Sequence, residues 1–517
     1  MLRVPPLNRS AAGIIIPPHD YRLYSLAITW IVDRGLAMGV ARELGEKVVG
    51  LDWATVDDEA LHWAKVGILD IIGVTLAGAP EDCVRIAANA MATGRPTSGD
   101  DGPAMVFGFG RRTGVLDAAF INGVAAHALD FDDVSNTLGG HPSAPLVPAL
   151  IALGEEMGTV APVSGRDLIV AYLAGFETEC AIARGVNFHH YEKGWHPTAT
   201  LGTLGAAAAC AKLLGLDADG IALALGLAVS FSSGLKANFG TMTKPLHIGQ
   251  TNRNGLLAAL LARDGFTANR DSFEHPQGFF EVFDGAGNYD AERVVPGFAD
   301  PFNIVEPGLA IKRHPCCGST HSAIDALLEL RHRHGLGPKN VDHILSWTHA
   351  RGLTHTFRPD PKSALDAKFS VQYVLARALM HGQVKIEHFN AGAYNDADAR
   401  AVMARITAEP HPAPEDISEG LFIGEVKVTT ASGTVYSLAL ENPVGYSSAN
   451  PLPAGAVRDK FNDCAGRLLT ADKVAALGDA VEALETLEDI RALTEIVADA
   501  GLLEETGALA SLSTAAG

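Results

Sequence analysis

Cysteine is scarce in this chain of 517 residues and is not placed for a structural role. The six cysteines include no CxxC pair and no zinc-type spacing with histidine, and they are too few for a disulfide framework. These absences exclude a disulfide-stabilised scaffold and a zinc module, and they favour a reducing cytoplasm as the location. We interpret the adjacent Cys316 and Cys317 as two small buried residues rather than a redox pair.

Positive charge and long apolar runs are also in short supply. The sequence has 40 Lys and Arg against 60 Asp and Glu, a formal net charge of −20, and no basic block. Nucleic acid and anionic membrane surfaces are therefore poor partners for it. We find no run of the roughly 18 apolar residues that a transmembrane helix requires, and no clear signal peptide. An anionic substrate stays possible, but its site must be locally positive.

Several catalytic motifs are missing. The sequence contains no GxSxG, HExxH or P-loop. A glycine-rich stretch at residues 108–114 has the spacing GxGxxxG and no surrounding βαβ pattern, so it predicts a glycine turn rather than a dinucleotide loop.

The sequence is otherwise that of a globular protein, with 47% apolar and 19% charged residues, long enough for about two or three folding units. Apolar residues at helical spacing dominate up to about residue 271, and strands are predicted only beyond it, at Val341–Thr348 and in a hairpin from Glu425 to Leu440. Helices return at Ala456–Leu468 and Ala471–Val497. We predict an irregular extension (1–37), an all-helical domain (38–271), an α+β segment (272–445), C-terminal helices that complete the helical domain (446–503) and a loose tail (504–517).

Histidine followed by proline recurs at predicted helix starts, at His141, His196 and His314. Helix starts expose unpaired N–H groups, so histidines there could hold a small carboxylate and move a proton. A single His-Pro is usually only loop chemistry; its recurrence in the same context favours the functional interpretation. Lys244 also precedes a proline, in a predicted Gly-rich loop, where it either binds a carboxylate or faces solvent.

An acidic cluster, Asp130, Asp132 and Asp133, precedes the first His-Pro. Aspartates at such a position are either turn formers and helix caps or ionisable groups of a site, and the sequence leaves both interpretations open.

Taken together, these motifs resemble the MmgE/PrpD family over roughly residues 45–500. The family includes 2-methylcitrate dehydratase, cis-aconitate decarboxylase and iminodisuccinate epimerase. The resemblance implies a mostly α fold, in which a large helical domain is completed by the C-terminal helices and a smaller α+β lid is inserted. It also implies a homodimer and a site that needs no metal and no organic cofactor. The resemblance rests on residues 127–133, 141–143, 194–198, 244–249 and 312–318, together with Thr320 and His321.

The resemblance also implies which residues form the site. His141 and His196 are expected as an acid/base pair and Lys244 as a carboxylate ligand that offsets developing charge. Asp130 is expected to orient a histidine or to bind a substrate hydroxyl. The remaining expected members are His321 as a further catalytic residue and Cys317, Lys312 and Asp133 as substrate-binding residues.

We therefore expect a cofactor-independent lyase acting on a small di- or tricarboxylic acid. Dehydration of a 2-methylcitrate-like hydroxy acid is the first choice, and decarboxylation of a cis-aconitate-like acid or epimerisation of a dicarboxylate are the alternatives. Two positions depart from relatives: Val134 stands where threonine is frequent, and Cys317 where the animal decarboxylases have histidine. The missing hydroxyl at Val134 faintly favours a non-catalytic small-acid binding protein on the same scaffold.

Overall fold

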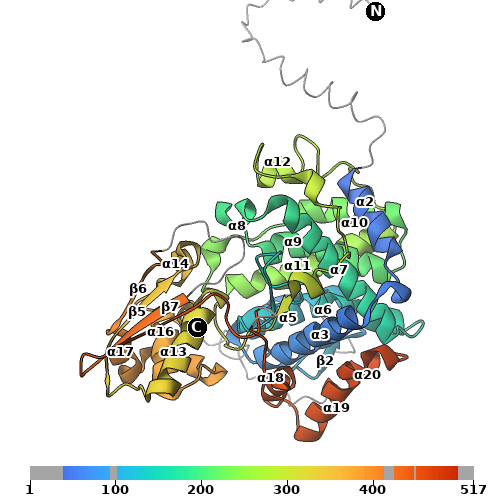
Figure 1. The fold of residues 1–517 in the computed structure, drawn as a ribbon. Helices are drawn as coiled ribbons and strands as arrows, with labels where there is room; N and C mark the ends of the chain where they lie inside the picture. Colours follow the sequence, from blue (N-terminus) through green and yellow to red (C-terminus); the bar gives the residue numbers. More distant parts are fainter. Residues whose placement is uncertain (1–38, 93–101, 391, 413–423, 447–449, 499–517) are drawn as a thin grey trace, which may run out of the picture. The chain divides into compact units, whose positions relative to one another are not determined.

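The computed structural model describes residues 39–92, 102–390, 392–412, 424–446 and 450–498. The chain divides into two units, residues 1–39 and 40–517, and the description below concerns the second. The fold is mostly α-helical with small sheets, as predicted (Figure 1). The expected N-terminal extension and C-terminal tail lie outside the described residues, and the predicted domain boundaries stay predictions.

Helices whose contact faces carry glycine and alanine form the larger part of the fold, here called the helical part. A side chain on Gly255 of α11 would lie 2.3 Å from the Ala206 side chain of α9, and one on Gly175 of α7 would lie 2.7 Å from Ala209. These approaches explain why the sequence is rich in small residues. The helices are α2 (Val40–Gly50), α3 (Asp58–Gly78), α4 (Asp82–Ala92), α5 (Val115–Ala128), α6 (Val147–Gly158), α7 (Gly165–Val186), α8 (His189–Lys193), α9 (Pro197–Leu213), α10 (Ala218–Phe231), α11 (Thr243–Arg263) and α12 (Phe279–Phe283).

Helix α3 is, by length and composition, apolar enough to cross a membrane, although it contains no unbroken run of about 18 apolar residues. However, 72% of its apolar window is buried inside the protein, and its Asp70 pairs with Lys460 of α18 at 2.6 Å. The core helix of a globular fold passes the same test, so the finding is weak evidence for a membrane span.

Short antiparallel pairs occur at two places in the helical part. β1 (Ala104–Val106) and β2 (Arg111–Thr113) form a hairpin whose turn holds the glycines at 108 and 110, so the predicted glycine turn is confirmed. β3 (Val134–Ser135) pairs with β4 (Leu309–Ala310) directly beside the acidic cluster.

A four-stranded sheet with helices forms the α+β part, comprising α13–α17 and β5–β8. The strand order is β6-β5-β7-β8, with β5 and β6 parallel and the other pairs antiparallel. Helices α13 and α16 pack against this sheet (Figure 1). The predicted strand and hairpin are both confirmed. The elements are α13 (His321–His334), β5 (Val341–Thr348), α14 (Ala350–Thr356), α15 (Ala364–Ala367), α16 (Val371–His381), α17 (Ala397–Met403), β6 (Ile406–Pro410), β7 (Gly424–Thr430) and β8 (Val435–Leu440).

The C-terminal helices pack on the helical part, α18 (Ala456–Ala465) and α19 (Ala471–Glu482) against α3, and α20 (Arg491–Val497) against α6. The predicted continuous helix from Ala471 to Val497 is wrong. The chain breaks between α19 and α20 because the backbone there bonds with the segment before α7. Leu487 accepts from the Gly165 N–H, and the Ile490 N–H donates to the Val163 carbonyl, each at 2.9 Å.

Candidate active site

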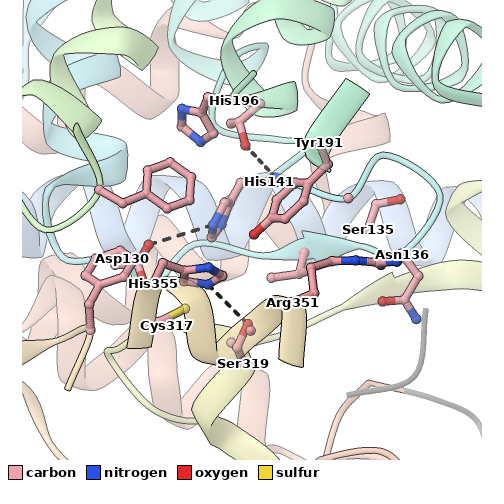
Figure 2. Close-up of a pocket in the computed structure, with 18 of the residues that line it drawn as sticks. Asp130, Ser135, Asn136, His141, Tyr191, His196, Cys317, Ser319, Arg351 and His355 are labelled. Carbon is pink, nitrogen blue, oxygen red and sulfur yellow. Dashed lines mark hydrogen bonds and ion pairs between the residues drawn. The ribbon is translucent and has the colours of Figure 1, made fainter. Parts of the chain in front are cut away.

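A cavity of about 140 Å³ is lined by residues of both the helical part and the α+β part (Figure 2). This volume has room for several waters or a small organic acid. Of the residues expected from the sequence, Asp130, His141, His196, Lys244, Lys312 and Cys317 line it. The structure therefore brings together side chains that lie up to 187 positions apart in sequence. The other lining residues include Val134, Ser135, Asn136, Phe188, Tyr191, Thr198, Phe239, Ser319, Thr348, His349, Arg351, His355 and Phe369.

Asp130 lies immediately after α5 in a left-handed backbone conformation (φ 52°), which aspartate tolerates better than most residues. Its carboxylate bonds the Lys244 ammonium through Oδ1 and lies 3.1 Å from Lys312 Nζ through Oδ2. Burial alone would raise the pKa of Asp130, but the charges of Lys244 and Lys312 together hold it well below its ordinary value. The site therefore contains one carboxylate clamped between two ammonium groups.

Lys244 is in the first turn of α11 rather than in a loop, so that part of the prediction is wrong. Pro245 is accommodated because the first turn of a helix needs no bonded N–H at that position. Lys244 is 4% exposed, and its Nζ lies 2.7 Å from His127 Nε2 and 5.2 Å from the centre of the Phe239 ring. The solvent-facing alternative is thereby excluded.

Lys312 approaches Asp130 from the segment after β4. Its Nζ donates to the Asp130 carbonyl at 2.8 Å as well as to the carboxylate, and the residue is 1% exposed. Burial opposes its charge, but Asp130 and Asp132 together raise the pKa of Lys312, so it stays cationic. Two fixed positive groups therefore face the cavity of an acidic protein.

His141 occupies the middle of the cavity wall, between Asp130 and His196 in Figure 2. Its backbone N–H donates to Thr198 Oγ1 at 3.0 Å. Its Nδ1 lies 3.2 Å from both the side-chain Oδ2 and the carbonyl oxygen of Asp132, and its Nε2 lies 3.8 Å from Asp130 Oδ1. Burial lowers the pKa of His141, Asp132 opposes this effect, and the Lys312 and Lys244 charges add to it.

His196 occupies the N-cap position of α9, directly before Pro197, so this His-Pro lies at a helix start as predicted. Its Nδ1 lies 3.2 Å from Nδ1 of the partly exposed His247, and its ring packs edge-on against Phe239 at 4.9 Å. Burial, reinforced by the Lys244 charge, lowers the pKa of His196 well below the ordinary value. With both pKa values lowered, His141 and His196 are neutral imidazoles at neutral pH.

The α+β part supplies the opposite wall of the cavity. The Ser319 hydroxyl lies 3.4 Å from His355 Nε2, and Arg351 pairs with Glu192 at 2.8 Å. Burial raises the pKa of the Cys317 thiol, which stays protonated, and burial lowers the pKa of His355 to about 3. Cys317 is therefore a wall residue rather than a nucleophile.

Two expected residues lie outside the cavity lining. His321 is fully buried behind it, with Nε2 3.1 Å from the Cys316 carbonyl, because α13 begins with this residue and turns it towards the interior. Asp133 points away, accepting from the Ser143 N–H at 3.2 Å and from the Ser143 hydroxyl. The structure places neither His321 nor Asp133 in the lining of this cavity, and their direct contact with a substrate stays a prediction. The third His-Pro histidine, His314, instead bonds Asp325 at 3.0 Å.

Sequence reasoning missed several lining residues. Tyr191, Phe239 and Phe369 come from separate segments, Arg351 and His355 both come from α14, and no local pattern marks any of them. His127 and Asp132 both belong to the segment 127–133 that carries the family resemblance, but neither was expected as a site residue.

His127, Asp132 and His141 place their ligand atoms within 4.8 Å of one another, as a metal site would. The nitrogens of His127 and His141 lie 2.7 and 3.2 Å from the same Asp132 oxygen, which are hydrogen-bond distances. Lys244 also points its ammonium at the other nitrogen of His127 and would repel a cation. The group fits a hydrogen-bonded cluster better than a metal site.

Comparison with known proteins agrees with the motifs. Residues 42–292 match the MmgE/PrpD N-terminal domain and residues 314–486 the MmgE/PrpD C-terminal domain. A cis-aconitate decarboxylase of Mus musculus is 31% identical over 403 residues, covering 77% of this chain and 81% of that protein. The cis-aconitate decarboxylase of Homo sapiens is 29% identical over 466 residues, covering 89% and 94%. That of Aspergillus terreus is 28% identical over 487 residues, covering 90% and 97%.

Proposed function

The chain belongs to the MmgE/PrpD family, and from that premise we propose that it is a lyase that decarboxylates a cis-aconitate-like unsaturated tricarboxylic acid. One observation carries the proposal beyond the names of its relatives. A single cavity presents two fixed ammonium groups, Lys244 and Lys312, next to two neutral imidazoles, His141 and His196. Positive charge for an anion and groups that exchange protons are what this reaction needs.

The reaction separates charge in a way that the cavity can stabilise. In such an acid one carboxylate is attached to a saturated carbon next to a double bond that is conjugated with a second carboxylate. When the carbon–carbon bond to the first carboxylate breaks, CO2 leaves and the electron pair shifts the double bond. Negative charge then spreads onto the second carboxylate, where Lys244 and Lys312 offset it. A proton added to the carbon that carries the second carboxylate completes the product.

The histidines are suited to deliver that proton. The pKa values of both are lowered because the histidines are buried and lie near the Lys244 charge. A bound polyanion opposes this effect, so that His141 or His196 takes up a proton when substrate is present. The reaction consumes one proton in each turnover, and His247, partly exposed and 3.2 Å from His196, offers a path from solvent.

Aromatic rings complete the environment of the departing group. Phe239 and Phe369 line the cavity with ring centres 5.8 Å apart, and Phe239 also packs against His196. A carboxylate held against such a surface is poorly solvated, whereas the neutral CO2 that it becomes loses little there. The apolar wall therefore favours the bond-breaking step.

Dehydration of a 2-methylcitrate-like acid, the first choice from the sequence, stays a prediction, since the Mus musculus, Homo sapiens and Aspergillus terreus relatives are cis-aconitate decarboxylases. Epimerisation and plain binding of a small acid also stay open. Val134 lines the cavity and offers no hydroxyl to a substrate, which is the feature that favours a non-catalytic binding protein.

One experiment separates these reactions. Purified protein is incubated in D2O with cis-aconitate, 2-methylcitrate and a panel of small dicarboxylates, and proton NMR follows each acid over time. We expect loss of cis-aconitate, CO2 release and one deuterium in the new methylene group of the product. Water elimination from 2-methylcitrate, exchange without net reaction, or binding without product would each replace the proposal with the corresponding alternative.

A homodimer remains a prediction from the resemblance, and a cytoplasmic location remains a prediction from the cysteine content. Size-exclusion chromatography with light scattering gives the first: a mass near twice the 54.2 kDa of the chain is expected, and the mass of a single chain would contradict it.

A further inference from the structure

Two buried residues behind the cavity, His127 and Asp132, contact groups that line it. Neither lines the cavity itself, and their exposures are 1% and 0%. His127 lies in the last turn of α5, and Asp132 in the loop that follows. The mechanism proposed above gives neither of them a role.

The hydrogen bonds of His127 fix its protonation. Nδ1 lies 2.7 Å from Asp132 Oδ2, and Nε2 lies 2.7 Å from Lys244 Nζ. A carboxylate can only accept and an ammonium group can only donate. The imidazole must therefore carry its hydrogen on Nδ1 and a lone pair on Nε2.

The same carboxylate fixes His141. Its Nδ1 faces two acceptors, Oδ2 and the carbonyl oxygen of Asp132, each at 3.2 Å. The hydrogen of the neutral ring is therefore on Nδ1, and the lone pair is on Nε2, which lies 3.8 Å from Asp130 Oδ1. His141 lines the cavity, so the atom left free to exchange a proton is Nε2.

We propose that Asp132 and His127 are positioning residues for the cavity. Asp132 imposes one tautomer on both histidines, and His127 in turn aims the Lys244 ammonium by accepting from it. A single buried carboxylate thus sets the proton-exchanging atom of His141 and the direction of Lys244. A neutral histidine side chain in water favours the opposite tautomer, with the hydrogen on Nε2, so the protein has to impose this one.

The pKa shifts of His127 and Asp132 are consistent with this assignment of the hydrogens. Burial is the largest influence on His127 and lowers its pKa to about 3, with Asp132 opposing and Lys244 and His141 adding to the shift. Burial would raise the pKa of Asp132, but His127 and His141 together hold it well below the ordinary value. A neutral His127 between a carboxylate and an ammonium group is the state that the hydrogen bonds require.

The inference rests on the proposed function only in that His141 and Lys244 act on the substrate, and the first test does not depend on turnover. Nitrogen-15 NMR of the imidazoles in the ligand-free protein, with His127→Gln and His141→Gln used for assignment, reports which nitrogen carries the hydrogen. We expect Nδ1–H for both rings. An Nε2–H signal for either ring would overturn the proposal even if every catalytic prediction held.

Two substitutions at one position separate positioning from simple packing. In His127→Gln the amide oxygen can take the place of Nε2 and accept from Lys244, whereas His127→Asn can reach Asp132 but not Lys244. Isothermal titration with citrate should show affinity within about threefold of wild type for the Gln variant, and a loss of about 10- to 100-fold for the Asn variant. Equal losses in two folded variants would mean that His127 serves packing alone.

Asp132→Asn tests the support of His141, with a control elsewhere in the chain. His190 and Asp284 form a similar fully buried pair at 3.1 Å, but His190 Nε2 bonds Thr200, which does not line the cavity. Asp132→Asn should move the high-pH limb of the pH profile of kcat to lower pH by about 1 to 3 units, because the protonated His141 loses the carboxylate that stabilises it. Asp284→Asn should lower the melting temperature without moving that limb. An unmoved limb in Asp132→Asn, or an equal shift in both variants, would overturn the proposal; absence of turnover in the wild type would instead refute the proposed function.

Discussion

Replacing Asp130 by asparagine separates its electrostatic role from its shape. The variant keeps the side-chain volume but leaves the ammonium groups of Lys244 and Lys312 without their shared counter-ion. Both lysines are buried, 4% and 1% exposed, so water cannot take over the role of the carboxylate.

The size of the effect follows from the geometry. Asp130 Oδ2 lies 3.1 Å from Lys312 Nζ. At an effective dielectric constant of about 20, a pair at this separation attracts by about 5 kcal/mol, and the contact with Lys244 is of the same kind. Desolvation offsets part of this attraction, and breaking a buried pair typically costs about 3–5 kcal/mol. We expect Asp130→Asn to lose about that much free energy of unfolding, a large part of a typical total of about 5–15 kcal/mol.

The assay is urea unfolding followed by circular dichroism at neutral pH, with and without citrate. Without the carboxylate the cavity is more positive, so citrate should stabilise Asp130→Asn more than wild type. Asp264→Asn is the control, since Asp264 forms an exposed pair with Arg263 at 2.8 Å and should leave the unfolding curve nearly unchanged.

The pKa of Asp130 also predicts in which direction the free energy of unfolding changes with pH. The folded-state pKa of Asp130 is lowered, so its stabilisation is present above the unfolded pKa of about 3.9 and is lost as pH falls towards the folded value. Wild type should lose this contribution in acid, and Asp130→Asn should lack that part of the dependence. An Asp130→Asn variant that is as stable as wild type and binds citrate no better would refute the role of Asp130 as the shared counter-ion of Lys244 and Lys312.

Three further predictions concern proton transfer and burial. His141→Gln and His196→Gln should each lower kcat by about 100-fold or more while the melting temperature stays within a few degrees, and near-full turnover in either would remove that histidine from the mechanism. For wild type, the high-pH limb should lie at higher pH in kcat than in kcat/KM, because bound substrate raises the lowered pKa values of these histidines; coincident limbs would contradict this. Burial raises the pKa of Glu177 to about 7, so its contribution to stability is full below about pH 4.5 and is lost as pH rises through 7; Glu177→Gln should flatten the melting temperature over this range, and an unchanged slope would count against it.

The elements with strong local patterns could be predicted from the sequence. The strand Val341–Thr348 was found with the same bounds, because its alternating residues match a half-buried strand. The helix predicted from Ala471 to Val497 failed, because the break near Leu484 depends on contact with a segment more than 300 residues earlier, which periodicity cannot register.

The candidate site was predictable where motifs carried it and not elsewhere. His141 and His196 follow from the recurrent His-Pro motif and Asp130 from the family resemblance, and all three line one cavity. His321 belonged to the same motif, but α13 turns it into the interior, a direction that the sequence does not specify. His355 enters the cavity from α14 through tertiary packing alone.

A crystal structure of the protein with a non-reacting tricarboxylate, such as citrate, tests the central claim most directly. The account predicts one ligand in the cavity, with a carboxylate bonded to both Lys244 and Lys312 and a carbon within reach of His141 Nε2 or His196. A ligand bound outside this cavity, or inside it without contact to either lysine, would contradict the account.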